Sequence, residues 1–234
     1  MQKIRGKSLR TIENNTEYKG CTFYVDEEKS YYLENSIFDN CSFRTDVEFC
    51  TVTHCKFINC GFSDKLRLDW SGEKITNLPE ETGLLPYITE LLLCRNLIIP
   101  PEIFLLPRIV HLDLSSNELT KIPKEIGQLS SLQSLYIDDN RLRSLPKEIW
   151  QLYSLEYLSL STNKLTKIPK EIGQLSSLVY LDLSWNRLTH IPKELEDLPK
   201  KSVGFPHLYL DIEWNEIEEQ EQKRIKFWRP DIKF

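Results

Sequence analysis

Cysteine is the residue type in this sequence with the clearest capacity for chemistry. Five of the six cysteines lie between residues 21 and 60, and a possible metal-binding set occurs among them: Cys50, His54, Cys55 and Cys60. Thiolate and imidazole groups bind Zn²⁺, but the ligands must converge at about 2.3 Å from the metal. Buried cysteine also behaves as a small hydrophobic residue. The favoured interpretation is packed thiols, with a disulfide or a metal site as alternatives.

A second set of residue types, His111, Asp113 and Ser115, matches those of a hydrolase triad. Their alternate spacing places them along one face of an extended strand, where they point outward rather than toward one another. The sequence contains no glycine-rich phosphate loop, no Gly-x-Ser-x-Gly motif and no His-Glu-x-x-His motif. We therefore expect no catalytic residue, no metal and no cofactor, in a protein that is not an enzyme.

The composition limits the class of protein. The 234 residues are 40% hydrophobic and 28% charged, with a net charge of −5. These values favour a folded chain and disfavour a nucleic-acid binder, which needs clustered positive charge. No apolar run approaches the roughly 20 residues that span a bilayer, and the N-terminal residues lack the apolar segment of a signal peptide. We predict a cytoplasmic location, with non-classical export left open.

Leucine is distributed unevenly: 33 of its 35 occurrences follow residue 65. The leucines accompany a ladder of asparagines at intervals of 21 to 29 residues: Asn96, Asn117, Asn140, Asn163, Asn186 and Asn215. Aliphatic residues precede each asparagine by five and three positions, and another follows two positions later. A degenerate earlier copy runs from Leu68 to Pro79. Alternating aliphatics place two side chains on one face of a short strand, and such strands must stack in parallel to bury them.

This pattern resembles the leucine-rich repeat family, over residues 65–217. The segment LTKIPKEIGQLSSL, present at both 119–132 and 165–178, is similar to bacterial repeats of the Leptospira type and to scaffolds that bind Ras-like GTPases. The resemblance implies an α/β solenoid: a horseshoe whose parallel sheet lines the concave face and whose convex side carries short helical turns. It also implies a binding module, of bacterial origin.

Residues 17–64 follow a different period. Phe38, Phe43, Val52, Phe57 and Phe62 are mostly five residues apart, and each follows a small residue by two positions. This segment resembles a pentapeptide repeat, which implies a short square β-solenoid of about two coils with the cysteines packed inward. We expect it to cap the first leucine repeat. Residues 1–16 are expected to be an extension, and residues 218–234 a C-terminal helical cap that ends before Pro230.

The residues just before, between and just after the two aliphatic residues of each strand should face solvent on the concave side. Toward its C-terminal half these are aromatic and acidic: Tyr136, Tyr157, Tyr180, Asp182, Trp185, Tyr209, Asp211, Glu213 and Trp214. Exposed aromatics are typical of interface hot spots, and carboxylates favour partners that carry basic residues. We therefore predict a protein or peptide partner on this face, with no nucleic acid and no membrane span. The alternatives are a tyrosine ladder that only stiffens the sheet, a small-GTPase regulator, and a structural, adhesive or exported effector solenoid.

Overall fold

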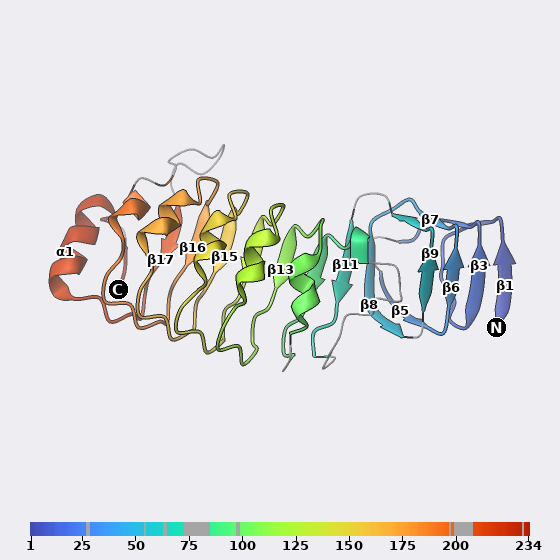
Figure 1. The fold of residues 1–234 in the computed structure, drawn as a ribbon, viewed down its shortest axis with the longest axis horizontal. Coiled ribbons are helices and arrows are strands. Elements are labelled where there is room, and N and C mark those ends of the chain that lie inside the picture. The colour runs from blue at the N-terminus through green and yellow to red at the C-terminus, as the bar shows by residue number, and fades with distance from the viewer. Residues whose placement is uncertain are drawn as a thin grey trace. The chain divides into compact units, whose positions relative to one another are not determined.

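The computed structural model describes residues 1–26, 29–53, 55–62, 65–72, 85–96, 99–196, 198, 208–230 and 232–234. The chain forms two compact units, and Figure 1 labels many of their strands and the C-terminal helix α1. Unit 1 comprises residues 1–93 and 98–109, and unit 2 comprises residues 94–97 and 110–234. His54 and residues 73–79 of the degenerate repeat lie outside the described part. So do Ile98, the aliphatic residue two positions after Asn96, and residues 199–206, which the sequence predicts to be a surface loop in the longest interval between repeat asparagines.

Unit 1 is a β-solenoid whose strands are all parallel. One sheet contains β1 (Gln2–Arg5), β3 (Thr16–Lys19), β6 (Ile37–Asp39) and β9 (Lys56–Ile58). The second contains β2 (Ser8–Leu9), β4 (Thr22–Phe23), β7 (Ser42–Phe43) and β10 (Gly61–Phe62). In the third, β5 (Ser30–Glu34), β8 (Val47–Thr53), β11 (Leu66–Asp69) and β12 (Glu90–Leu92) are neighbours, so the coils of the N-terminal segment pair directly with the first leucine-containing strands.

The core of unit 1 contains two columns of stacked rings. Tyr18, Phe38 and Phe57 stack at centroid distances of 5.0 and 4.5 Å. A second column, Phe23, Phe43 and Phe62, stacks at 4.8 and 4.7 Å. The phenylalanines that the five-residue spacing predicts to point inward therefore do point into the core.

Two expectations for the N-terminal segment differ from the structure. Among the described residues the strands form three sheets, not the four sides of a square coil, because the long strands β5 and β8 make one continuous side. The expectation of an extension over residues 1–16 is wrong for residues 2–9, which form β1 and β2. There Ile4 pairs with Tyr18 and Leu9 with Phe23, so two half-buried aliphatic side chains cover the ends of the aromatic columns.

Unit 2 carries the regular leucine repeats. Its parallel strands are in register: β13 (His111–Asp113), β14 (Ser134–Tyr136), β15 (Tyr157–Ser159), β16 (Tyr180–Asp182) and β17 (Tyr209–Asp211). The aliphatic side chains that alternate along these strands are buried. Each return segment contains a 3₁₀ helix: η4 (Lys124–Gln128), η5 (Lys147–Gln151), η6 (Lys170–Gln174) and η7 (Lys193–Glu196). In unit 1, η2 (Leu85–Tyr87) and η3 (Pro101–Leu105) are of the same kind.

The repeat asparagines connect successive repeats of unit 2. Asn163 donates from Nδ2 to the carbonyl oxygens of Leu160 and Ile137, and its Oδ1 accepts the N–H of Leu142 at 3.0 Å. Asn140, Asn186 and Asn215 repeat this pattern. Each side chain satisfies backbone groups that a strand ending inside the core would leave without partners.

The single α-helix among the described residues, α1 (Glu219–Trp228), follows the last strand and ends before Pro230, as predicted. The sequence offers Ile217, Ile225 and Phe227 for one apolar side of this cap. Ile217 and Ile225 are buried, whereas Phe227 is 91% exposed, because residues two positions apart do not share a helix face.

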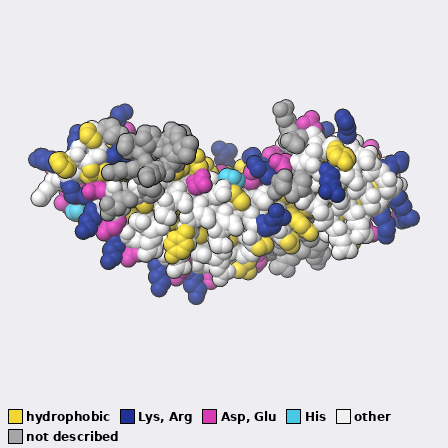
Figure 2. All heavy atoms as spheres, turned by 90° about the horizontal axis from the view of Figure 1, so that it is seen from above, with side chains coloured by type: hydrophobic (Ala, Val, Ile, Leu, Met, Phe, Trp, Pro, Cys, Tyr) yellow, Lys and Arg dark blue, Asp and Glu magenta, His cyan; other side chains and the backbone are white. Residues whose placement is uncertain are grey.

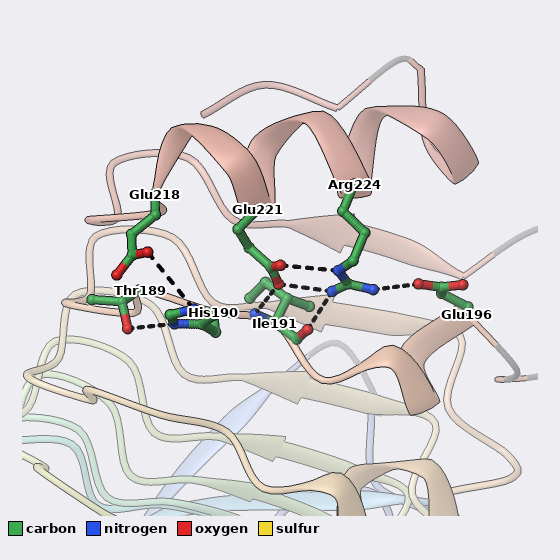
Figure 3. Close-up of polar contacts among 7 residues, drawn as sticks. All are labelled: Thr189, His190, Ile191, Glu196, Glu218, Glu221 and Arg224. Carbon is green, nitrogen blue, oxygen red and sulfur yellow. Dashed lines mark hydrogen bonds and ion pairs between the residues drawn. The ribbon is translucent and has the colours of Figure 1, made fainter.

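A polar cluster attaches α1 to the preceding repeat (Figure 3). The guanidinium of Arg224 donates to Glu221, to Glu196 and to the carbonyl oxygen of Ile191, and Glu221 accepts the Ile191 N–H at 3.0 Å. The hydrogen bonds from Arg224 lower the pKa of Glu221. The helix is therefore anchored through both charge and burial.

Charged side chains of both signs are interspersed on the surface drawn in Figure 2, and hydrophobic side chains form small separate patches there. No helix in the described part of the chain is long and apolar enough to cross a membrane.

Candidate partner-binding surface

The side of strands β13 to β17 that faces solvent is called the sheet face of unit 2; it corresponds to the surface that the sequence predicts to be concave. In-register pairing aligns Tyr157, Tyr180 and Tyr209 in one column, and Asp182 beside Asp211 in the next. The structure thus brings together the aromatic and acidic residues of the last three strands, as the repeat register indicated.

The tyrosine column is packed only at its C-terminal end. The rings of Tyr180 and Tyr209 stack at 4.7 Å with an interplanar angle of 3°, whereas Tyr157 and Tyr180 are 6.2 Å apart and tilted by 31°. Tyr157 is 38% exposed, Tyr209 is 51% exposed and Tyr180 is half-buried. Tyr136 occupies the neighbouring column, in register with Ser159. The column therefore stiffens the sheet and still presents ring surface to solvent.

Trp185 and Trp214 form a separate stack, at 4.8 Å and 19°. Their side chains are 55% and 60% exposed. Each lies three positions after the last residue of a strand, and the N–H of Trp185 donates to the carbonyl oxygen of Glu213 at 2.9 Å. Two indoles are thus displayed at one edge of the sheet face.

Both tryptophans have left-handed backbone conformations, which sequence reasoning did not predict. The residue before the repeat asparagine has φ between 52° and 60° in every described repeat: Arg95, Ser116, Asp139, Thr162, Trp185 and Trp214. A left-handed conformation costs a residue with a side chain about 1–2 kcal/mol, and bulky residues rarely adopt it. A stacked aromatic pair contributes about 0.5–1.5 kcal/mol beyond the area that it buries. Every described repeat has the left-handed conformation at this position, so the conformation alone does not require tryptophan there.

The carboxylates of the sheet face have few compensating charges. Asp182 accepts hydrogen bonds from the N–H and hydroxyl of Ser184, and Asp211 accepts the N–H of Glu213. Among the described residues, the one cation within ion-pair distance of Asp182, Asp211 or Glu213 is Lys233, whose Nζ lies 3.8 Å from Glu213. Acidic side chains therefore lie side by side with little neutralisation.

This arrangement alters the acid–base properties of the face. Burial, together with the charges of Asp182 and Glu213, raises the pKa of Asp211. Burial and the neighbouring Asp182 raise the pKa of Tyr180 to about 12. Burial also raises the pKa of Asp138, a residue of this face that the predicted site omitted. A bound cation would reverse the electrostatic part of each effect.

A small cavity of about 240 Å³ lies at the C-terminal edge of the sheet face, and the segment after α1 forms one of its walls. Its lining includes Tyr209, Asp211 and Glu213 from the last repeat, and Arg229, Ile232 and Lys233 from that segment. Arg229 donates to the carbonyl oxygen of Leu208 at 2.9 Å, and Ile232 is buried. Sequence reasoning did not assign these last three residues to the site, because they follow the repeats and carry no repeat register.

Comparison with known proteins identifies the family. The model of the family described as "Leucine rich repeat" matches residues 86–142, 130–188 and 154–217. The chain belongs to the leucine-rich repeat family. Proteins of this family generally serve as protein–protein interaction modules, and the fold is the solenoid that the repeats predicted.

Solved structures agree with this fold. A leucine-rich repeat protein of Leptospira interrogans is 24% identical, with a TM-score of 0.53, over 94% of this chain and 77% of its own. Internalin C2 of Listeria monocytogenes is 26% identical, with a TM-score of 0.52, over 69% of this chain and 65% of its own. No curated protein matches.

The cysteines of this leucine-rich repeat protein pack as thiols. Cys21, Cys41 and Cys60 each donate to a carbonyl oxygen of the preceding coil, at 3.3 to 3.6 Å. None of the six cysteines forms a disulfide, and burial raises the pKa of Cys55. In the described ranges no group of three His, Cys, Asp or Glu side chains is placed to hold a metal ion.

Proposed function

We propose that this leucine-rich repeat protein binds a protein or peptide segment that carries basic side chains, on the C-terminal half of the sheet face of unit 2. The observation that carries the proposal is the row of carboxylates between two aromatic stacks. Tyr180 and Tyr209 lie on one side of Asp182 and Asp211 along the strands, and Trp185 and Trp214 lie beyond them on the other. The predicted contact residues are Tyr136, Tyr157, Tyr180, Asp182, Trp185, Tyr209, Asp211, Glu213 and Trp214.

Electrostatics supports a cationic partner. Asp182 and Asp211 are adjacent on neighbouring strands, and burial with like charge raises the pKa of Asp211. A lysine or arginine side chain placed between them would relieve that repulsion, and it would add charge-assisted hydrogen bonds. The exposed rings would supply the apolar contact area that interface hot spots need.

The N-terminal part of the same sheet face offers a matched contrast. Asp113 on β13 occupies the same position in its repeat as Asp182, and its Oδ1 accepts the N–H of Ser115 just as Asp182 accepts that of Ser184. Its flanking positions hold His111 and Ser116 where β16 has Tyr180 and Trp185. Asp113 is in register with one exposed ring, Tyr136 of β14, but no tryptophan follows it in its repeat. A partner that needs a carboxylate between a tyrosine and a tryptophan should therefore depend less on Asp113.

The proposal is tested by selecting binders from a display library of random peptides and measuring their affinity by calorimetry. We expect selected peptides to be enriched in lysine and arginine. We further expect Asp182→Asn with Asp211→Asn to weaken binding at least tenfold, whereas Asp113→Asn, beside Tyr136 at the edge of the predicted surface, weakens it less than threefold. Selected peptides that lack basic residues, or that bind all three proteins equally, would show that function resides elsewhere. The cytoplasmic location and bacterial origin remain predictions.

A further inference from the structure

We propose that Trp185 and Trp214 are the anchors through which the sheet face of unit 2 recognises arginine in preference to lysine. The inference rests on the proposed function and deepens it. It names the basic group that the face binds and the two residues that select it.

Backbone conformation is the first observation. The solenoid imposes a left-handed residue before each repeat asparagine, and the other repeats of unit 2 fill that position with Arg95, Ser116, Asp139 and Thr162. In unit 1 four of the left-handed residues are asparagines, which tolerate this conformation well. Only the last two repeats place tryptophan there, with φ of 54° and 60°. Strained positions of this kind are concentrated at sites of function.

The orientation of the two rings is the second observation. The indoles stack on each other, yet both remain more than half exposed. Thr162, the preceding residue in the same column, is too small to cover Trp185. In the described part of the chain no cation lies over either ring. Ring surface is therefore available to a ligand.

The choice of arginine follows from the shape and chemistry of the surface. A guanidinium is planar, lies flat on an indole, and pairs with carboxylates through a fork of N–H donors, whereas an ammonium is a compact and strongly hydrated point charge. Asp182 and Asp211 lie between the tyrosine and tryptophan stacks along the strands. One arginine side chain can thus contact an indole face and a carboxylate together, and lysine would keep only the charge.

A test that needs no ligand separates a binding role from a structural one. Trp185→Asn and Trp214→Asn replace the strained residue with one that favours the left-handed region, and Thr162→Asn makes the same change at the equivalent position of the previous repeat. If the tryptophans serve binding, the thermal unfolding midpoints of the tryptophan variants will equal or exceed that of the wild type, as we expect for Thr162→Asn. A clear drop confined to the tryptophan variants would make the pair a structural clamp and overturn the inference.

The second test uses tetra-arginine and tetra-lysine peptides at equal ionic strength, with binding followed by calorimetry. We expect the wild type to bind the arginine peptide about three- to thirtyfold more tightly, and the Trp185→Asn/Trp214→Asn double variant to bind both peptides alike. Equal affinities for the wild type, or no binding of the arginine peptide, would overturn the inference. Asp182→Asn with Asp211→Asn should weaken both peptides. If the double aspartate variant binds both peptides as tightly as the wild type and still prefers the arginine peptide, the carboxylates do not contribute to binding as the proposed function requires. The role of the tryptophans would then stand.

Discussion

Asparagine 186 connects the scaffold to the proposed site, and its replacement by alanine gives a quantitative test. Its Nδ2 donates to the carbonyl oxygens of Leu183, Ser184 and Leu160, at 3.1, 3.2 and 2.9 Å. Its Oδ1 accepts the buried N–H of Leu165 at 3.0 Å. The same residue directly follows Trp185, so it fixes the turn that displays the indole.

The expected loss of stability follows from these contacts. Two Nδ2 protons shared among three carbonyls, and one accepted N–H, amount to about three hydrogen bonds. Each contributes about 1 kcal/mol net, and an orphaned buried N–H costs about 1–3 kcal/mol. Two lost donated bonds and one orphaned N–H should therefore destabilise Asn186→Ala by about 3–5 kcal/mol. For a chain of this size that corresponds to a fall of roughly 6–20 °C in the unfolding midpoint.

Asn140 provides the matched control. It is also 6% exposed, and it makes the corresponding bonds to Ile137, Asp138, Leu114 and Leu119 at 3.0 to 3.1 Å. Circular dichroism should show similar losses for Asn140→Ala and Asn186→Ala. Calorimetry with a peptide selected on the wild type should show weaker binding for Asn186→Ala alone. A loss below about 1 kcal/mol for both variants would refute the hydrogen-bond reasoning. If both variants bind the peptide equally well, the turn that Asn186 holds does not contribute to the proposed site.

Three further perturbations should respond as the structure dictates. Lowering the pH should weaken the binding of a basic peptide as Asp211 is protonated. Because the pKa of Asp211 is raised, this loss should begin at a higher pH than it would for an exposed aspartate, whose pKa is about 3.9. Calorimetry across the acid range checks this. The pKa of Glu221 is lowered by Arg224, so its stabilisation is full above about pH 4.3 and is lost as the pH falls through its folded value. Glu221→Gln should lower stability by only about 1 kcal/mol at neutral pH, because solvent partly screens Arg224. The same variant should also show a smaller fall of the unfolding midpoint as the pH is lowered. Gly127→Ala would place a Cβ 2.8 Å from the Cβ of Glu148 and 2.9 Å from its carbonyl oxygen, so denaturant titration should show a loss of about 1–3 kcal/mol.

Much of the fold followed from the sequence because the repeat unit is short and its period is explicit. Alternating aliphatics on both sides of a repeat asparagine fix which side chains enter the core, and stacking in register fixes the columns on the opposite face. Tyr180 beside Tyr209 and Asp182 beside Asp211 could therefore be placed before any coordinates. The 3₁₀ helices after Pro123, Pro146 and Pro169 agree with the short helical turns that the family resemblance implied.

The other features of the fold and of the site depend on backbone geometry that the repeat pattern does not specify. Ile4 and Leu9 lie five residues apart like the later phenylalanines, but two aliphatic positions without a cysteine or a ring gave too weak a signal to extend the coil. The contact of Lys233 with Glu213 depends on where the chain returns after α1, which has no periodicity. The left-handed backbone of Trp185 could not be read from its outward position alone.

The position of the tryptophans shows how a solenoid can separate folding from binding. Leucines and asparagines determine the backbone of every repeat, including a left-handed residue that the fold needs and that serine, threonine, aspartate or arginine can occupy. Because that backbone is set by neighbouring side chains, the identity of the left-handed residue is free to change without altering the repeat. In two adjacent repeats this freedom is used for large exposed rings that the left-handed conformation does not require. The proposed contact with an arginine of a partner would explain why tryptophan occupies that position.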